Sequence, residues 1–182
     1  GQLGNNSTTQ SVVPVQAIAA GSNVTAVATG FQHSCAVISG GVRCWGDNSR
    51  GQLGNNSTAQ SFVPVQAIAP GSNVTAVSAG TDHSCALVNG GVQCWGYNNT
   101  GQLGINSTAS SAVPVQTIAA GDNVTAVSAG GHYTHSGSHS CAVVNGGVKC
   151  WGFNFNGQLG NNSTTNSLTP VQTIAAGSNV TA

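Results

Sequence analysis

The chain has 182 residues, of which 3% are charged, and its three basic and three acidic side chains leave no net charge. An uncharged chain lacks the basic surface that attracts nucleic acid or an anionic membrane, so neither partner is expected. No apolar run approaches the roughly 18 residues of a membrane-spanning helix, and a hydrophobic content of 39% argues against disorder.

A four-residue motif, Gly-Gln-Leu-Gly, recurs along the chain and sets its period. It begins at Gly1, Gly51, Gly101 and Gly157. Such a period is typical of architectures in which each unit buries a face against the next. We therefore predict a single repeat array with units at residues 1–50, 51–100 and 101–156, the last with a six-residue insert near 131–138, and a partial unit at 157–182.

The pattern of each repeat predicts four short strands, which are rich in β-branched residues and are separated by glycine and asparagine. In the first repeat we expect them at residues 24–28, 35–38, 41–45 and 63–68. Pro64 indicates that the fourth is an edge strand, where a missing N–H costs little. The chain also begins with a segment of fourth-strand sequence, and no segment has a helical apolar period. The sequence thus predicts an all-β fold of four-stranded antiparallel sheets.

Six cysteines form three pairs, each with a spacing of nine residues: Cys35 with Cys44, Cys85 with Cys94, and Cys141 with Cys150. A two-residue turn, Ser-Gly or Asn-Gly, lies midway in every pair and suits a type I′ hairpin. Counting outward from that turn places the two cysteines opposite each other, where the strands approach most closely. We therefore expect one disulfide per hairpin and an oxidising compartment. The alternatives are buried free thiols, or a metal site, which two cysteines opposed on one hairpin would enclose poorly.

The repeat resembles a known family through its recurring words. Residues 33–37, 40–48, 51–54 and 63–65, above all Cys-Trp-Gly-x-Asn followed by Gly-Gln-Leu-Gly, are similar to the regulator of chromosome condensation repeat. The resemblance implies a β-propeller, usually with seven blades of four strands. Paired cysteines in each repeat resemble the secreted bacterial branch of the family. The founding member is a nucleotide-exchange factor for a small GTPase, but no residue here reproduces its loop surfaces, so only the fold is carried over.

Two sets of large apolar residues hold equivalent places in the repeats: Trp45, Trp95 and Trp151, and Leu53, Leu103 and Leu159. Hairpin parity puts each tryptophan on the strand face opposite the disulfide. We expect both sets to pack between neighbouring blades, because every blade must bury the same face. A sugar-binding stack is the alternative for the tryptophans.

Histidines precede the first cysteine of each pair at His33, His83 and His139, and we expect them to be structural, each bonded to a nearby backbone group. The chain has no glutamate and only three scattered aspartates, so no catalytic pair or triad can be assembled. We expect neither enzyme activity nor a cofactor. In the insert, His132 and His135 form a candidate metal site with His139, and a projecting loop is the alternative.

Asn-x-Ser/Thr sequons recur twice in each repeat and make their asparagines candidate glycosylation sites. These are Asn6, Asn23, Asn56, Asn73, Asn106, Asn123, Asn162 and Asn179. Further sequons begin at Asn5, Asn55, Asn98 and Asn161. Glycosylation of serine or threonine is an alternative.

Three complete hairpins do not close a seven-bladed ring, so blade edges at both ends are expected to seek partners. From the absence of an initial Met and of a signal peptide we expect a mature or excised piece of a longer precursor. We expect a secreted, non-catalytic structural protein, extracellular or on the cell surface, that assembles with copies of itself or with further repeats into an oligomer or filament. The alternatives are a secreted propeller that binds a protein or glycan through one rim, and an exchange factor.

Overall fold

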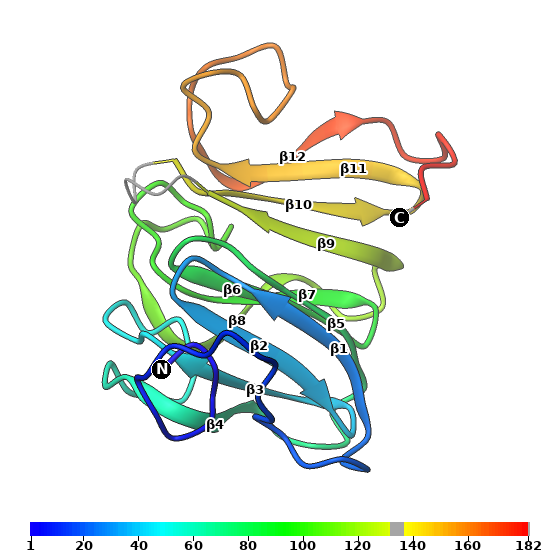
Figure 1. Ribbon diagram of the computed structural model, residues 1–182. Helices are drawn as coiled ribbons and strands as arrows, with labels where there is room; N and C mark the ends of the chain where they lie inside the picture. Colours follow the sequence, from blue (N-terminus) through cyan, green and yellow to red (C-terminus); the bar gives the residue numbers. More distant parts are fainter. Residues whose placement is uncertain (132–136, 182) are drawn as a thin grey trace.

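A computed structural model describes residues 1–131 and 137–181 of the protein. The described chain forms three four-stranded antiparallel sheets. Figure 1 shows that they are stacked face to face in chain order, so that each sheet is one blade. Among the described residues, no helix is long and apolar enough to cross a bilayer. The predicted all-β fold is confirmed.

Within every blade the strands pair in sequence order. Blade 1 consists of β1 (Val24–Thr29), β2 (His33–Ile38), β3 (Gly41–Gly46) and β4 (Ser61–Ile68). Blade 2 consists of β5 (Val74–Ala79), β6 (His83–Val88), β7 (Gly91–Gly96) and β8 (Ser111–Ile118). Blade 3 consists of β9 (Val124–Gly130), β10 (His139–Val144), β11 (Gly147–Gly152) and β12 (Ser167–Ile174). The strands predicted for the first repeat are confirmed, each one or two residues longer than expected.

The central hairpin of each blade has the expected turn and register. Ser39 and Gly40 have φ angles of 49° and 72°, the positive values that a type I′ turn requires. Cys35 then lies opposite Cys44. All three predicted disulfides are formed, with Cα separations of 4.0, 4.1 and 4.0 Å.

One predicted strand is wrong. Residues 11–18 differ from β4 at a single position, yet they form no strand, and Val12 is fully exposed. In each blade the fourth strand forms its ladder with the third strand. No strand of the described structure pairs with residues 11–18, so their backbone has no ladder to join. Where a partner is present, Pro64 does lie in an outermost strand, as predicted.

The apolar core lies between the blades. In the hairpin of each blade, the strand face that carries the cysteines is called the disulfide face, and the opposite one the tryptophan face. The first core cluster joins the disulfide face of blade 1 to the tryptophan face of blade 2, and its hairpin residues are Cys35, Val37, Val42, Cys44, Ala86, Val88 and Trp95. The second joins blade 2 to blade 3 in the same way, through Cys85, Leu87, Val92, Cys94, Ala142, Val144 and Trp151. Each junction therefore has the same polarity.

Candidate functional site: the blade junction

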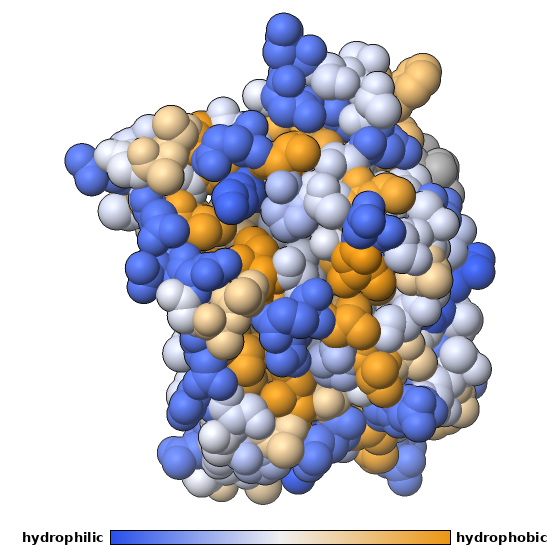
Figure 2. Space-filling model, turned by 180° about the vertical axis from the view of Figure 1, so that it is seen from behind, coloured by the Kyte–Doolittle hydropathy of each residue, from blue (hydrophilic) through white to orange (hydrophobic). Residues whose placement is uncertain are grey.

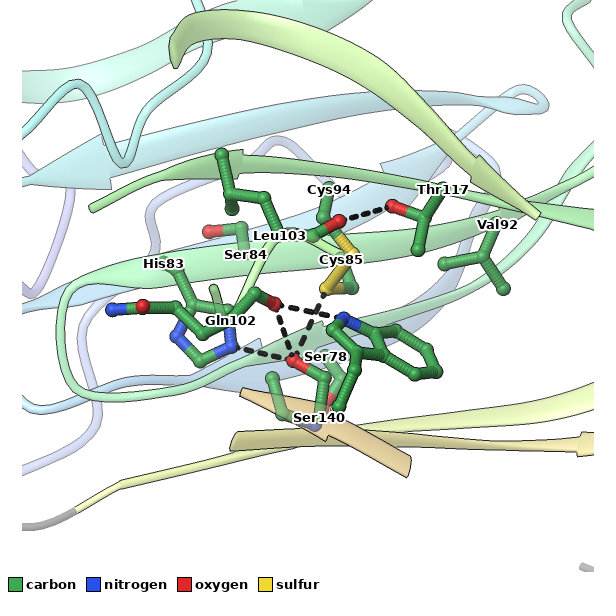
Figure 3. Close-up of a disulfide and its surroundings, with 12 residues drawn as sticks. Ser78, His83, Ser84, Cys85, Val92, Cys94, Gln102, Leu103, Thr117 and Ser140 are labelled. Carbon is green, nitrogen blue, oxygen red and sulfur yellow. Dashed lines mark hydrogen bonds between the residues drawn. A yellow bond between two sulfur atoms is a disulfide. The ribbon is translucent and has the colours of Figure 1, made fainter. Parts of the chain in front are cut away.

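The junction between blades 2 and 3 is organised around one serine (Figure 3). The Ser140 hydroxyl donates a hydrogen bond to the backbone carbonyl of Gln102 at 2.9 Å and lies 2.9 Å from Nε2 of His83. Nε1 of Trp151 donates to the same Gln102 carbonyl at 2.9 Å. Because the serine gives its only proton to the carbonyl, it accepts from the imidazole N–H. One carbonyl from a connecting loop thus ties two side chains of the next blade.

The same network recurs between blades 1 and 2. The Ser84 hydroxyl donates to the Gln52 carbonyl at 3.0 Å and lies 2.9 Å from Nε2 of His33, and Trp95 donates to that carbonyl at 2.9 Å. The expectation that the histidines bond a nearby backbone group is confirmed for His139, which bonds the backbone of Gly137, but it is wrong for His33 and His83. Each instead bonds a side chain of the next blade, brought close by packing between repeats.

Burial keeps the junction histidines neutral. It lowers the pKa of His33 to about 4, partly opposed by the charge of Asp47. It also lowers the pKa of His83 to about 3, an effect that the neighbouring His33 and His139 add to. Nδ1 of both rings is buried without a hydrogen-bond partner, so an added proton there would find no acceptor. The buried serine proton points to a carbonyl and not to the imidazole, so these Ser–His pairs have a structural geometry and not that of an activated nucleophile.

Four of the six predicted packing residues, Trp95, Trp151, Leu53 and Leu103, lie at these junctions. Trp45 instead bonds Gln2 of the N-terminal segment, and Leu159 lies in the loop that follows β11. Trp95 and Trp151 are completely buried, as are the side chains of Leu53, Leu103 and Leu159. Gly54 lets the loop approach the indole: its φ is +72°, and a Cβ there would lie 2.8 Å from Nε1 of Trp95. Leu53 and Leu103 belong to the two core clusters.

The sequence analysis did not predict a structural role for one buried asparagine in each repeat. Asn48, Asn98 and Asn154 are fully buried. The Asn48 side chain donates to the carbonyls of Ser57 and Ala59 and accepts from the N–H of Leu53. This asparagine therefore shapes the loop that carries the Gly-Gln-Leu-Gly motif. Its invariant place two residues after Trp-Gly was the signal that could have found it.

The candidate modification and metal residues have different surroundings. All eight candidate glycosylation asparagines are exposed, whereas Asn98, which also begins a sequon, is buried. His132 and His135 of the candidate metal site lie outside the described residues, and His139 is partly buried in β10. Within the described ranges, no group of three or more His, Cys, Asp or Glu side chains is placed to hold an ion.

Both ends of the stack leave a blade face open. On the disulfide face of blade 3, an apolar hollow of about 110 Å³ is lined in part by Cys141, Val143 and Val148. On blade 1, Val24 and Val27 are 42% and 71% exposed. From behind, the surface shows apolar side chains in a broken band between polar ones (Figure 2). The two kinds of face that meet at every inner junction therefore both have uncovered apolar residues at the ends, although residues 1–4 lie over Trp45 on blade 1.

Sequence comparison identifies the repeat. The model of the regulator of chromosome condensation (RCC1) repeat matches residues 39–87, 89–136 and 145–182, and a second model of this repeat matches 24–52 and 74–102. The chain belongs to the RCC1 repeat family. Its three disulfides indicate an oxidising, extracellular-type environment.

Solved structures show the same fold in longer chains. Human WBSCR16 matches with a TM-score of 0.68 and 24% identity, over 82% of this chain and 40% of that one. Prp20p from Saccharomyces cerevisiae matches with a TM-score of 0.70 and 22% identity, over 86% and 39%. This RCC1-repeat chain thus has a propeller fold and spans about two fifths of the length of these proteins. A search of curated protein sequences gave no significant match.

Proposed function

We propose that the chain is a secreted, non-catalytic structural repeat protein that self-assembles through its open blade faces into an extracellular oligomer or filament. One observation carries the proposal. The disulfide face left open on blade 3 and the tryptophan face left open on blade 1 are the two halves of a junction that occurs twice within the chain.

Complementary open faces and a low charge both favour contact between copies. A contact between unlike faces adds copies head to tail, which gives a ring if the rotation closes and an open filament if it does not. With 3% charged residues and no net charge, there is little electrostatic repulsion between copies. The buried Ser–His pairs support a role without catalysis, and the disulfides support secretion.

Sedimentation velocity over a concentration series tests this proposal. The wild-type chain should form species larger than a monomer as its concentration rises. Val143→Asp places a carboxylate on the open disulfide face and should abolish them, whereas Val113→Asp, on the outer strand β8, should not. A wild-type monomer at all concentrations, or a Val143→Asp variant that assembles normally, would contradict the proposal. Negative-stain imaging of the assembled material separates rings from filaments.

We also propose that the exposed sequons are glycosylation sites, which would coat the rims and leave the blade faces free. Asn56 and Asn98 provide a matched pair, since the first is exposed and the second is buried. Peptide mapping of the chain secreted from a eukaryotic host should find glycan at Asn56 and none at Asn98. An unmodified Asn56 in such a host would argue against this extension.

A second candidate is a propeller that binds a protein or glycan through one rim. Prp20p, which shares this fold, has binding properties to Gsp1p and histones. This candidate predicts a monomer that captures a ligand without assembling, so the same sedimentation series separates it from self-assembly. Guanine-nucleotide exchange has the least support, because 22% identity extends to the fold alone.

A further inference from the structure

The two ends of the described chain carry nearly the same sequence. Residues 1–25 and 157–181 are identical at 21 of 25 positions, the exceptions being 10/166, 12/168, 13/169 and 17/173. We propose that, when a second copy docks, its residues 157–174 replace residues 1–18 on blade 1. This inference rests on the proposed self-assembly and names the contacts that achieve it.

Residues 1–4 occupy a place on blade 1 that belongs elsewhere to the preceding blade. The Gln2 carbonyl accepts hydrogen bonds from Nε1 of Trp45 at 2.7 Å and from the Ser34 hydroxyl at 3.1 Å. At the inner junctions, Gln52 and Gln102 accept the equivalent bonds, and both come from the loop of the blade before.

A docking copy brings a competitor for this place. Within one chain, blade 1 packs on blade 2. If blade 3 of the docking copy packs in the same way on blade 1 of the first copy, Gln158 of the docking copy lies at the indole of Trp45 of the first. One indole N–H has one proton to donate, so Gln2 and Gln158 exclude each other. Docking therefore requires the loop at residues 1–4 to leave.

The incoming loop is more completely hydrogen-bonded and more deeply buried than the loop that it replaces. Asn161 receives a hydrogen bond from the buried Asn154, as Asn55 does from Asn48. The equivalent Oδ1 of Asn5 is buried without a hydrogen-bond partner. Leu159 is fully buried while Leu3 is 39% exposed. The exchange therefore keeps the bonds to blade 1 and replaces a poorly supported loop by a well-supported one.

Docking adds contacts that no single copy makes. It covers Val24 and Val27 on blade 1 and the hollow beside Cys141 on blade 3. By the same repeat equivalence, it brings His139 opposite Ser34, as His33 lies opposite Ser84. The partner that fits the open face of blade 3 is thus the tryptophan face of a second copy.

Substitutions at two glycines test the exchange, because they should change the dissociation constant of the assembly in opposite directions. A Cβ at Gly4 would lie 2.7 Å from Nε1 of Trp45, so Gly4→Ala should loosen residues 1–4 and favour docking. A Cβ at Gly160 meets only the Cγ2 methyl carbon of Thr173, at 2.9 Å, within one copy, but after docking it would meet the Trp45 of the second copy. We expect the dissociation constant from sedimentation to fall about tenfold for Gly4→Ala and to rise about tenfold for Gly160→Ala.

Gly21→Ala is the matched control, since Gly21 also has a positive φ, +81°, but a Cβ there would meet nothing within 4 Å. It should assemble like the wild type. If the wild type assembles and Gly4→Ala weakens assembly, or neither Gly4→Ala nor Gly160→Ala changes it, the exchange is wrong while self-assembly stands. If the wild type and Gly4→Ala both stay monomeric, the exchange and the proposed function both fail.

Discussion

The inner junctions and the open ends contain the same residue types but differ in burial. Val74 and Val77, at the first inner junction, are 4% and 9% exposed, whereas Val24 and Val27, their equivalents on blade 1, are 42% and 71% exposed. The difference lies in the neighbouring sheet: in the described structure blade 1 packs against Val74 and Val77, whereas no blade packs against Val24 and Val27. In such an array, stability is a property of adjacent units, and we expect it to concentrate in the two inner junctions.

Acid should destabilise these junctions, and we expect it to lower the free energy of unfolding more than any single substitution below. The pKa of histidine is 6.5 when unperturbed, and burial lowers it to about 4 for His33 and about 3 for His83. Below pH 6.5 the unfolded chain binds protons that the folded chain does not, so stability is full above that pH and falls as the pH drops toward 4. The loss should be about 3 kcal/mol for each histidine, or about 6 kcal/mol for the pair.

Urea unfolding between pH 7.5 and pH 4 measures this loss. A His83→Gln variant should show a weaker dependence on pH, because one of the two buried groups no longer titrates. A free energy of unfolding that stays constant down to pH 4 would show that the histidines are not buried between blades.

Removing equivalent tryptophans compares a closed junction with an open end. Trp95→Ala should cost about 3–5 kcal/mol, because it leaves a cavity in the first core cluster. Trp45→Ala should cost about 2 kcal/mol, since residues 1–4 cover that ring in place of a blade. The free energy of unfolding in urea at neutral pH measures both. Equal losses would mean that the inner junction adds nothing to the burial of the ring.

The disulfides give a smaller contrast of the same kind. Cys85 and Cys94 are fully buried in a junction, whereas Cys141 lines the open hollow of blade 3. Limited reduction followed by alkylation and mass spectrometry should therefore label Cys141 and Cys150 before Cys85 and Cys94. Loss of one such bond should cost about 2–3 kcal/mol. Simultaneous labelling of all six cysteines would contradict the difference in burial.

The hairpins within each repeat could be predicted from the sequence, but the residue contacts between repeats could not. Turn chemistry and cysteine spacing fix the hairpin, because both act within about ten residues. Residues 11–18 have the sequence of a strand but not its structure, since a strand needs a partner that another segment supplies. The repeat pattern pointed to His33 but not to its hydrogen-bond partner Ser84, which lies 51 residues away in the next blade. Only packing between blades shows that the two meet.

Cryo-electron microscopy of the assembled protein would show which surfaces hold two copies together. We predict a head-to-tail contact in which the hairpin of Cys141 and Cys150 faces Trp45 of the next copy, and Gln158 replaces Gln2 at its indole. A contact made through the outer strands β4, β8 and β12, or through the rims, would contradict the view that the open faces are two halves of one junction.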